Sequence, residues 1–200
     1  MAIGMMVRTA LLLTVLVPYP ADIATAHPAF GGGGFIGGVL HPLLVPAHAL
    51  AIVGLGLLIA QQSPQWPWPA SAAYCAGLAA GFLGIVSAMV PPPLDNALLA
   101  SALVSSALIA LARPLPRLLV SALSLLTGLA LAFDSPPHSI SLREANIILI
   151  GTFCSAAVLL LAVIEGARAL SRNWQRLGVR IIGSWIAATA VMALVLRLAR

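Results

Sequence analysis

Residues 34–59 read GFIGGVLHPLLVPAHALAIVGLGLLI, and this stretch decides the fold. It is long and apolar enough to cross a bilayer as a helix, because about 20 residues at roughly 1.5 Å each suffice. It also contains two histidines, His41 and His48, and two prolines, Pro42 and Pro46. The histidines are seven residues apart, which is two turns of a straight helix, so their rings are expected on one face. The sequence therefore predicts a membrane-spanning helix with a polar stripe.

The two prolines add to this stripe. Each lacks the backbone N–H that a helix offers to the carbonyl four residues earlier. The carbonyls of Gly38 and Pro42 are therefore expected to be without their helical partners. Ring nitrogens and free carbonyl oxygens along one buried stripe are suitable ligands for a metal cation. We expect a cation site here.

The composition is typical of a polytopic membrane protein. Hydrophobic residues make up 61% of the 200 residues and charged residues 8%, whereas soluble domains carry about 25% charged residues. The mean hydropathy is +1.07. The net charge of +5 comes wholly from arginines near the predicted helix ends, so membrane orientation explains it and no nucleic-acid partner is expected. Cys75 and Cys154 lie inside apolar segments and are expected to be buried small side chains, without a disulfide or zinc role.

Residues 1–26 are expected to be a cleaved secretory signal peptide. Arg8 supplies the positive charge, residues 9–17 the short apolar core, and Ala24-Thr25-Ala26 the cleavage site. An uncleaved first helix is the alternative. Cleavage would make His27 the new N-terminus, where its amino group and imidazole together can chelate a metal. An ordinary first residue is the alternative there.

The mature chain, residues 27–200, is expected to be one all-α domain, a bundle of six transmembrane helices. Gly77 and Gly81 in the second helix belong to a small-residue stripe suited to close helix packing. Trp66 and Trp68, in the turn before it, suit a membrane interface. The expected spans are residues 35–60, 69–90, 94–112, 115–133, 144–170 and 177–198.

Six spans place both ends of the mature chain on the same side of the membrane, which the signal peptide makes the outer side. The positive-inside rule agrees, because the turns then assigned to the inner side carry most of the arginines. Those near the inner side are Arg113, Arg117, Arg168, Arg172, Arg176 and Arg180, against Arg143, Arg197 and Arg200 outside.

The same topology gathers acidic residues at the outer face. Asp95, Asp134, Glu144 and His138 all lie near the start of the helix that carries His41. Such a cluster could collect a divalent cation; the alternative is that these are ordinary turn and cap residues. Glu165, at the inner side, is three residues before Arg168, and an ion pair between them is the simplest interpretation.

No motif of a soluble enzyme occurs: the chain contains no GxSxG, no HExxH and no P-loop. We therefore expect no enzymatic activity.

The stretch HPLLVPAHALAIVGLGL, residues 41–57, together with the signal peptide and the six spans, resembles the HupE/UreJ family of membrane proteins. Members of this family are regarded as nickel or cobalt permeases linked to hydrogenase and urease systems. The family pattern in the first helix is close to HPxxGxDHxxxM. This chain keeps its first proline and both histidines, and departs from it at three positions, Val45, Ala47 and Ile52.

The fourth helix of the family carries a pattern similar to HGxAHGxExP, and residues 127–136, TGLALAFDSP, fit its frame. Asp134 takes the place of the glutamate. Thr127 and Leu131 stand where the family has histidines, and Leu160 stands at the place of a further histidine in the fifth helix.

The resemblance implies a secondary permease of the bacterial inner membrane that takes up Ni²⁺ or Co²⁺ from the periplasmic side and needs no resident cofactor. Two imidazoles alone form a sparse, uncharged shell for such an ion, so carboxylates have to contribute. The alternative is a diverged, non-transporting homologue that acts as a membrane accessory or assembly subunit, as a homo-oligomer or with a partner subunit. The candidate metal-binding residues are His41, His48, Asp134, Asp95 and His27.

Overall fold

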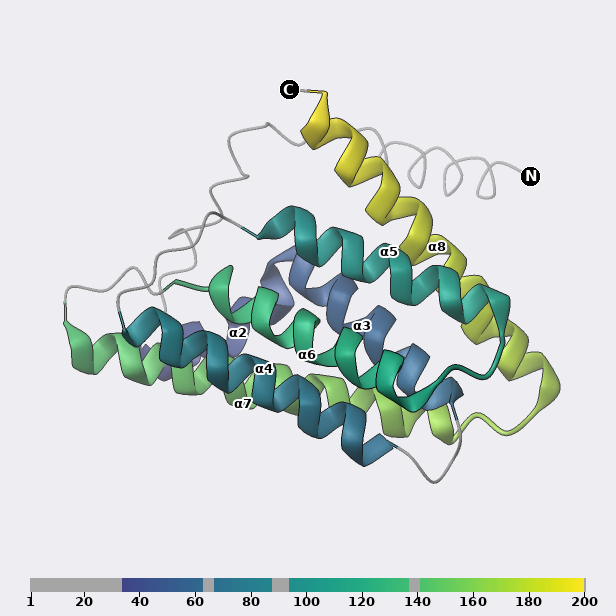
Figure 1. Cartoon of the computed structure of the whole chain (residues 1–200), viewed down its shortest axis with the longest axis horizontal. Helices are drawn as coiled ribbons and strands as arrows, with labels where there is room; N and C mark the ends of the chain where they lie inside the picture. The colour runs from purple at the N-terminus through teal and green to yellow at the C-terminus, as the bar shows by residue number, and fades with distance from the viewer. Residues whose placement is uncertain (1–33, 63–66, 88–93, 137–140, 200) are drawn as a thin grey trace, which may run out of the picture. The chain divides into compact units, whose positions relative to one another are not determined.

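The computed structural model describes residues 34–62, 67–87, 94–136 and 141–199, and this part of the chain is all-helical (Figure 1). The expected signal peptide, His27 and His138 lie outside the described residues. The helices are α2 (Gly34–Leu44), α3 (Pro46–Gln61), α4 (Pro67–Val86), α5 (Asp95–Leu111), α6 (Arg117–Phe133), α7 (Leu142–Arg168) and α8 (Asn173–Leu198).

The bounds of α4 to α8 lie within a few residues of those predicted, because caps and prolines mark them in the sequence. Pro116 directly precedes α6. The Ser141 side chain caps α7 by accepting a hydrogen bond from the backbone N–H of Glu144. Helix α8 begins four residues earlier than predicted, at Asn173, where the Gln175 side chain accepts a hydrogen bond of 2.9 Å from the backbone N–H of Arg172.

The prediction of one continuous first helix over residues 35–60 is wrong. The chain bends by 69° between α2 and α3. Val45, between the two helices, has extended backbone angles (φ −87°, ψ 110°). The following Pro46 explains this, because its ring disfavours the helical conformation at the preceding residue and it has no N–H to continue the helix.

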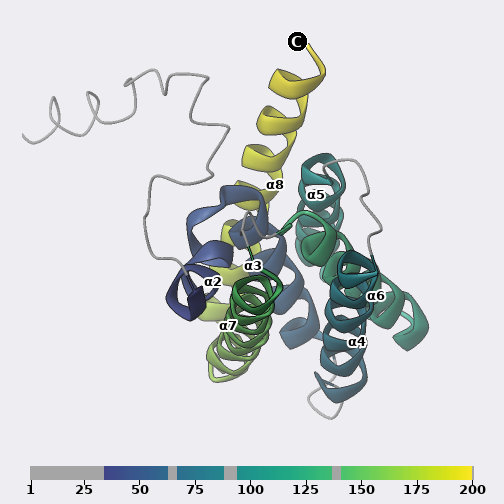
Figure 2. The ribbon, with the colours of Figure 1, turned by 90° about the vertical axis from the view of Figure 1, so that its left-hand side faces the viewer.

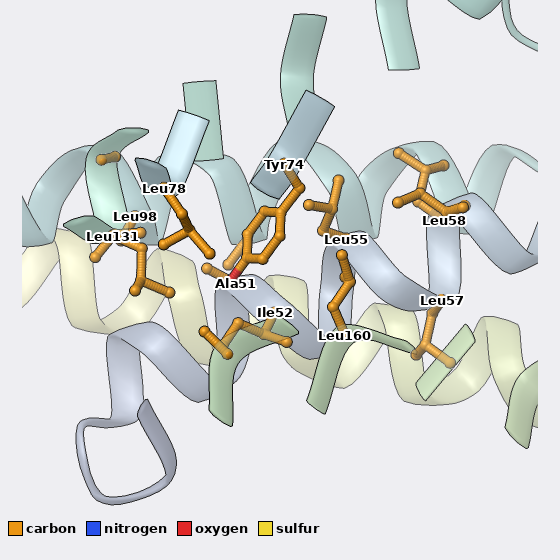
Figure 3. Packing of buried hydrophobic residues seen from close by; sticks show 14 of the residues in the cluster. Ala51, Ile52, Leu55, Leu57, Leu58, Tyr74, Leu78, Leu98, Leu131 and Leu160 are labelled. Carbon is orange, nitrogen blue, oxygen red and sulfur yellow. The ribbon is translucent and has the colours of Figure 1, made fainter. Parts of the chain in front are cut away.

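Helix α3 is the central element of the fold. It packs against each of the other described helices, as the end-on view in Figure 2 shows. Most of its residues are buried, among them Ile52, Leu55 and Leu58. Figure 3 shows Ile52 and Leu55 near Tyr74 of α4 and Leu160 of α7, with Leu58 further along α3. A helix that is apolar on all sides is expected at such a position.

Glycines allow two helix pairs to approach closely. A Cβ on Gly77 of α4 would overlap the Leu125 carbonyl of α6, and one on Gly128 of α6 would overlap the Tyr74 carbonyl of α4. The predicted small-residue packing of α4 is confirmed by these contacts. Gly38 and Gly151 make a second crossing of this kind, between α2 and α7.

The outer surface of the described part is apolar as well, as expected of a membrane protein. Leu118, Trp185 and Val158 are each more than half exposed. Trp68, predicted to lie at a membrane interface, is also exposed. Cys154 is exposed on α7 and Cys75 is partly buried, so the prediction of two buried cysteines is wrong: both helices turn part of their surface outward.

Three helices, α4, α7 and α8, are long and apolar enough to span a membrane, and the bent pair α2–α3 makes a fourth if it counts as one span. Helices α5 and α6 are apolar but have 17 residues each. That is about 26 Å of helix, somewhat less than the roughly 30 Å hydrocarbon core.

Candidate functional site

The two histidines of the bent segment lie against each other. The ring centroids of His41 and His48 are 5.0 Å apart, with an edge-to-face angle of 73°. In a straight helix, seven residues would separate them by about 10.5 Å along the axis. The bend at Val45 is therefore what brings the two rings into contact, and the predicted stacking along one straight helix face is corrected in this way.

His48 is held by a carboxylate from a different part of the chain. Its Nε2 lies 2.9 Å from Oδ2 of Asp134, the residue that ends α6. The other carboxylate oxygen, Oδ1, accepts a hydrogen bond of 2.9 Å from the backbone N–H of Leu94, just before α5. His48 is completely buried, and the Asp134 side chain is 8% exposed. The start of α3, the end of α6 and the start of α5 thus meet at one carboxylate.

This arrangement selects one tautomer of His48. An ionised Asp134 accepts hydrogen bonds only, so the neutral ring donates its proton from Nε2. The lone pair is then on Nδ1. That atom is buried and has no hydrogen-bond partner within the described residues. A histidine whose one nitrogen donates to a carboxylate while the other stays available has the form of a typical metal ligand with its orienting partner.

One of the carbonyls freed by proline has another partner. The Gly38 carbonyl, which Pro42 leaves without its helical donor, accepts a hydrogen bond of 3.2 Å from Thr152 Oγ1 of α7. Ser155 Oγ, one turn further along α7, donates to the Val39 carbonyl at 2.6 Å. The expectation that the Gly38 carbonyl faces an ion is therefore corrected: α7 supplies a hydroxyl to it.

The remaining predicted site residues are not brought to His48. Asp95 is 2.8 Å from Arg197 of α8, in a partly exposed ion pair. His27 lies outside the described residues. Within the described ranges, no group of three or more His, Cys, Asp or Glu side chains is close enough to hold a metal ion together. The predicted pair of Glu165 and Arg168 is confirmed at 2.8 Å, on an exposed part of α7.

Sequence reasoning missed the residues that support this site. The Leu94 N–H that holds Asp134 carries no signal in the sequence, because every backbone amide is alike. Thr152 could have been noticed as a hydroxyl in an apolar span, but nothing in the sequence pairs it with Gly38. Tyr74 and Ser106, whose hydroxyls are buried, give the same weak signal.

Comparison with known proteins finds one family. Its model, described as HupE / UreJ protein, matches residues 12–193 of this chain. No curated protein and no solved structure matches the chain.

Proposed function

The chain belongs to the HupE/UreJ family of membrane proteins, and from this premise we propose that it is a secondary permease for a divalent transition-metal cation, Ni²⁺ or Co²⁺. The family is related to nickel and cobalt transport. No ATP-binding motif occurs in the sequence, so a gradient or trapping on the inner side would drive uptake.

The hydrogen bond between His48 and Asp134 is the observation that carries this proposal. The carboxylate directs the Nδ1 lone pair of His48 away from itself, and the ring of His41 lies beside that histidine. Borderline cations such as Ni²⁺ prefer imidazole nitrogen. We therefore assign His48 and His41 as ligands of the transported ion and Asp134 as the group that orients His48.

The negative charge of Asp134 also offsets part of the positive charge of the ion. The family pattern has an aspartate immediately before the second histidine, and this chain has Ala47 there. A divalent cation in an uncharged buried shell would carry a large desolvation cost. Asp134, in contact with His48 from α6, supplies a negative charge at the same histidine and takes over that role.

Asp95 and His27 are proposed as earlier contacts of the incoming ion. Asp95 begins α5, one residue after the amide that binds Asp134. Its carboxylate is paired with Arg197, so it can accept the ion only when that pair opens. His27 would join it as the N-terminus left by cleavage of the signal peptide, residues 1–26.

The proposed location is the bacterial inner membrane, with six spans and both mature ends on the periplasmic side. Contacts between helix ends support this alternating order. His48 and Asp134 meet at one end of the bundle, where Leu94, the residue before Asp95, donates its N–H to Asp134. At the other end, Gln61 binds the Ile109 carbonyl and Gln62 the Leu115 amide. Helix α6 therefore runs antiparallel to both α3 and α5, which run parallel to each other, as the first, third and fourth of successive crossings require.

Uptake of radioactive nickel into proteoliposomes that contain the purified protein tests the proposal. We expect His48→Ala to reduce uptake to the level of empty vesicles, and His41→Ala to weaken it. Glu165→Gln is the matched control, since its carboxylate pairs with Arg168 on an exposed part of α7. Uptake that both histidine substitutions leave unchanged would remove these residues from the transport path.

One observation favours the second candidate, a non-transporting accessory or assembly subunit. Four positions where the family carries ligands hold side chains that are nearly completely buried and lack imidazole or carboxylate groups: Ala47, Thr127, Leu131 and Leu160. Leu131 and Leu160 belong to the apolar cluster around α3 (Figure 3). Purification in mild detergent that recovers a stoichiometric membrane partner, together with no nickel uptake, would support this second function.

A further inference from the structure

Among the residues that the structure describes, three buried hydroxyls differ from the other buried hydroxyls. In an apolar interior, a serine or threonine usually donates to a carbonyl of its own helix or of a neighbour. The buried hydroxyls of Ser71, Ser124, Thr127, Ser135 and Thr152 do so. Those of Ser105, Ser106 and Tyr74 have no hydrogen-bond partner among the described residues, although all three side chains are 0% exposed.

These hydroxyls all lie along α3, between His48 and the opposite end of the helix. Figure 3 shows Tyr74 pointing towards α3 at the level of Ala51 and Ile52. Further along, a Cβ on Gly54 would be 3.0 Å from Ser106 Oγ and 3.7 Å from Ser105 Cβ, so this serine pair of α5 faces the bare backbone of α3.

The last helical residue of α3 continues this series. Gln61 donates from its amide nitrogen to the Ile109 carbonyl, while its Oε1 is buried without a partner within the described part. From His48 to Gln61, the series covers 14 residues of α3, a rise of about 20 Å. The neighbouring Gln62 lines a hollow of about 120 Å³ together with Leu115 and Ser121. We call the side chains of Tyr74, Ser105, Ser106 and Gln61 the polar file.

The polar file costs stability. A buried polar group without a partner is unfavourable, and in a membrane interior no bulk water is available to relieve it. Alanine or phenylalanine would fit the same places without this cost. Polar groups that face the interior of a membrane bundle mark ion paths, and weak oxygen ligands in succession let an ion pass without retaining it.

We propose that the polar file is the inner half of the path along which the metal cation passes from His48 to the opposite side of the membrane. This inference rests on the proposed permease function. Hydroxyl and amide oxygens replace part of the hydration shell of the ion. Because the side chains of the two serines and the tyrosine are fully buried, the path is closed in this conformation and opens during the transport cycle. Arg117 also lines the hollow at this end of the path.

Cysteine labelling tests the path independently of transport. In a variant with Cys75→Ala and Cys154→Ala, Ser105→Cys and Ser106→Cys are each treated with a small cationic methanethiosulfonate reagent. Ser124→Cys is the control, because Ser124 is equally buried but donates to the Val120 carbonyl. We expect labelling at positions 105 and 106 to be at least about tenfold faster than at 124 and to be slowed by Ni²⁺. Equal rates at all three positions would overturn the proposal.

Uptake and stability provide the second measurement. The double variant Ser105→Ala with Ser106→Ala, and Tyr74→Phe, should reduce nickel uptake several-fold while nickel binding is kept. Their melting temperatures in detergent should not fall, because no hydrogen bond is lost. Ser124→Ala should keep uptake and melt slightly lower.

The two proposals fail in different ways. Wild-type uptake that is lost in His48→Ala but equal in the serine double variant and in Ser124→Ala would refute the polar file and leave the permease intact. Wild-type uptake no greater than that of empty vesicles would refute the permease, whereas uptake indifferent to His48 would remove His48 from the transport path and with it the start of the proposed path. The labelling rates still test the polar file in that case. If positions 105 and 106 are not labelled faster than position 124, the proposal that the polar file is part of an ion path is refuted as well.

Discussion

Asp134→Asn separates a metal-orienting carboxylate from a merely structural one. The amide of asparagine has one oxygen and one NH₂ group, and the structure determines which way it points. The Leu94 N–H is a donor, so the asparagine oxygen has to stay on that side. The NH₂ group then faces Nε2 of His48 and donates to it. His48 is forced into the other tautomer, with its proton on Nδ1.

The consequence for metal binding follows from that proton. Nδ1 is the nitrogen that remains available for a ligand, and a protonated nitrogen cannot bind a metal. Loss of the group that hydrogen-bonds to a metal-binding histidine and orients it typically weakens metal affinity about 10–100-fold, which is roughly 1.4–2.7 kcal/mol. We expect at least this loss, because the substitution removes a negative charge as well.

Isothermal titration of the purified protein in detergent with Ni²⁺ measures the effect. Asp134→Asn should bind at least about tenfold more weakly than wild type. It should melt at a similar temperature, because the hydrogen bond to Leu94 is kept. Glu165→Gln, which also removes one negative charge, should bind as wild type does. An Asp134→Asn protein with wild-type nickel affinity would refute both the tautomer argument and the role of Asp134.

Three further substitutions test the packing and the site. Thr152→Val removes the hydroxyl that donates to the Gly38 carbonyl of α2, so the free energy of unfolding in detergent should fall by about 1–3 kcal/mol. Thr189→Val, which removes an exposed hydroxyl, should change it little. Gly151→Ala places a Cβ against the backbone of α2 and should lower the melting temperature. Gly166→Ala, in the same helix, adds a Cβ that has no neighbouring atom within 4 Å, so the melting temperature should stay the same or rise. Ala47→Asp restores a carboxylate beside the buried histidine and should tighten nickel binding about tenfold in the same titration, so an unchanged affinity would contradict the charge argument.

Most of the helix pattern could be predicted because it is local. Helices α5 and α6 begin and end next to prolines, arginines and aspartates that separate apolar segments, and their bounds were predicted within two residues. The error in the first span has a local cause too. Pro42 and Pro46 were recognised as interruptions, but the size of the bend depends on where α7 and α3 pack, and that information is not local.

The candidate site was predictable only as a set of residues. His48 stood out because imidazole is rare in an apolar span, and Asp134 and Asp95 because each begins or ends one. Which carboxylate meets the histidine was open. In the structure, Asp134 binds His48 and Asp95 binds Arg197, because the start of α3 lies against the end of α6 while the end of α8 lies against the start of α5.

The amino-acid sequence by itself determined that this protein is helical, membrane-embedded and interrupted at its histidine-bearing segment, because hydropathy, proline and charge act within a few residues of chain. Only the tertiary structure decided that His41 contacts His48, that Thr152 donates a hydrogen bond to the Gly38 carbonyl and that Asp134 binds the buried imidazole of His48. The last two contacts join residues 114 and 86 positions apart along the chain. Such contacts depend on how whole helices pack, and glycine crossings such as Gly38 with Gly151 set that packing.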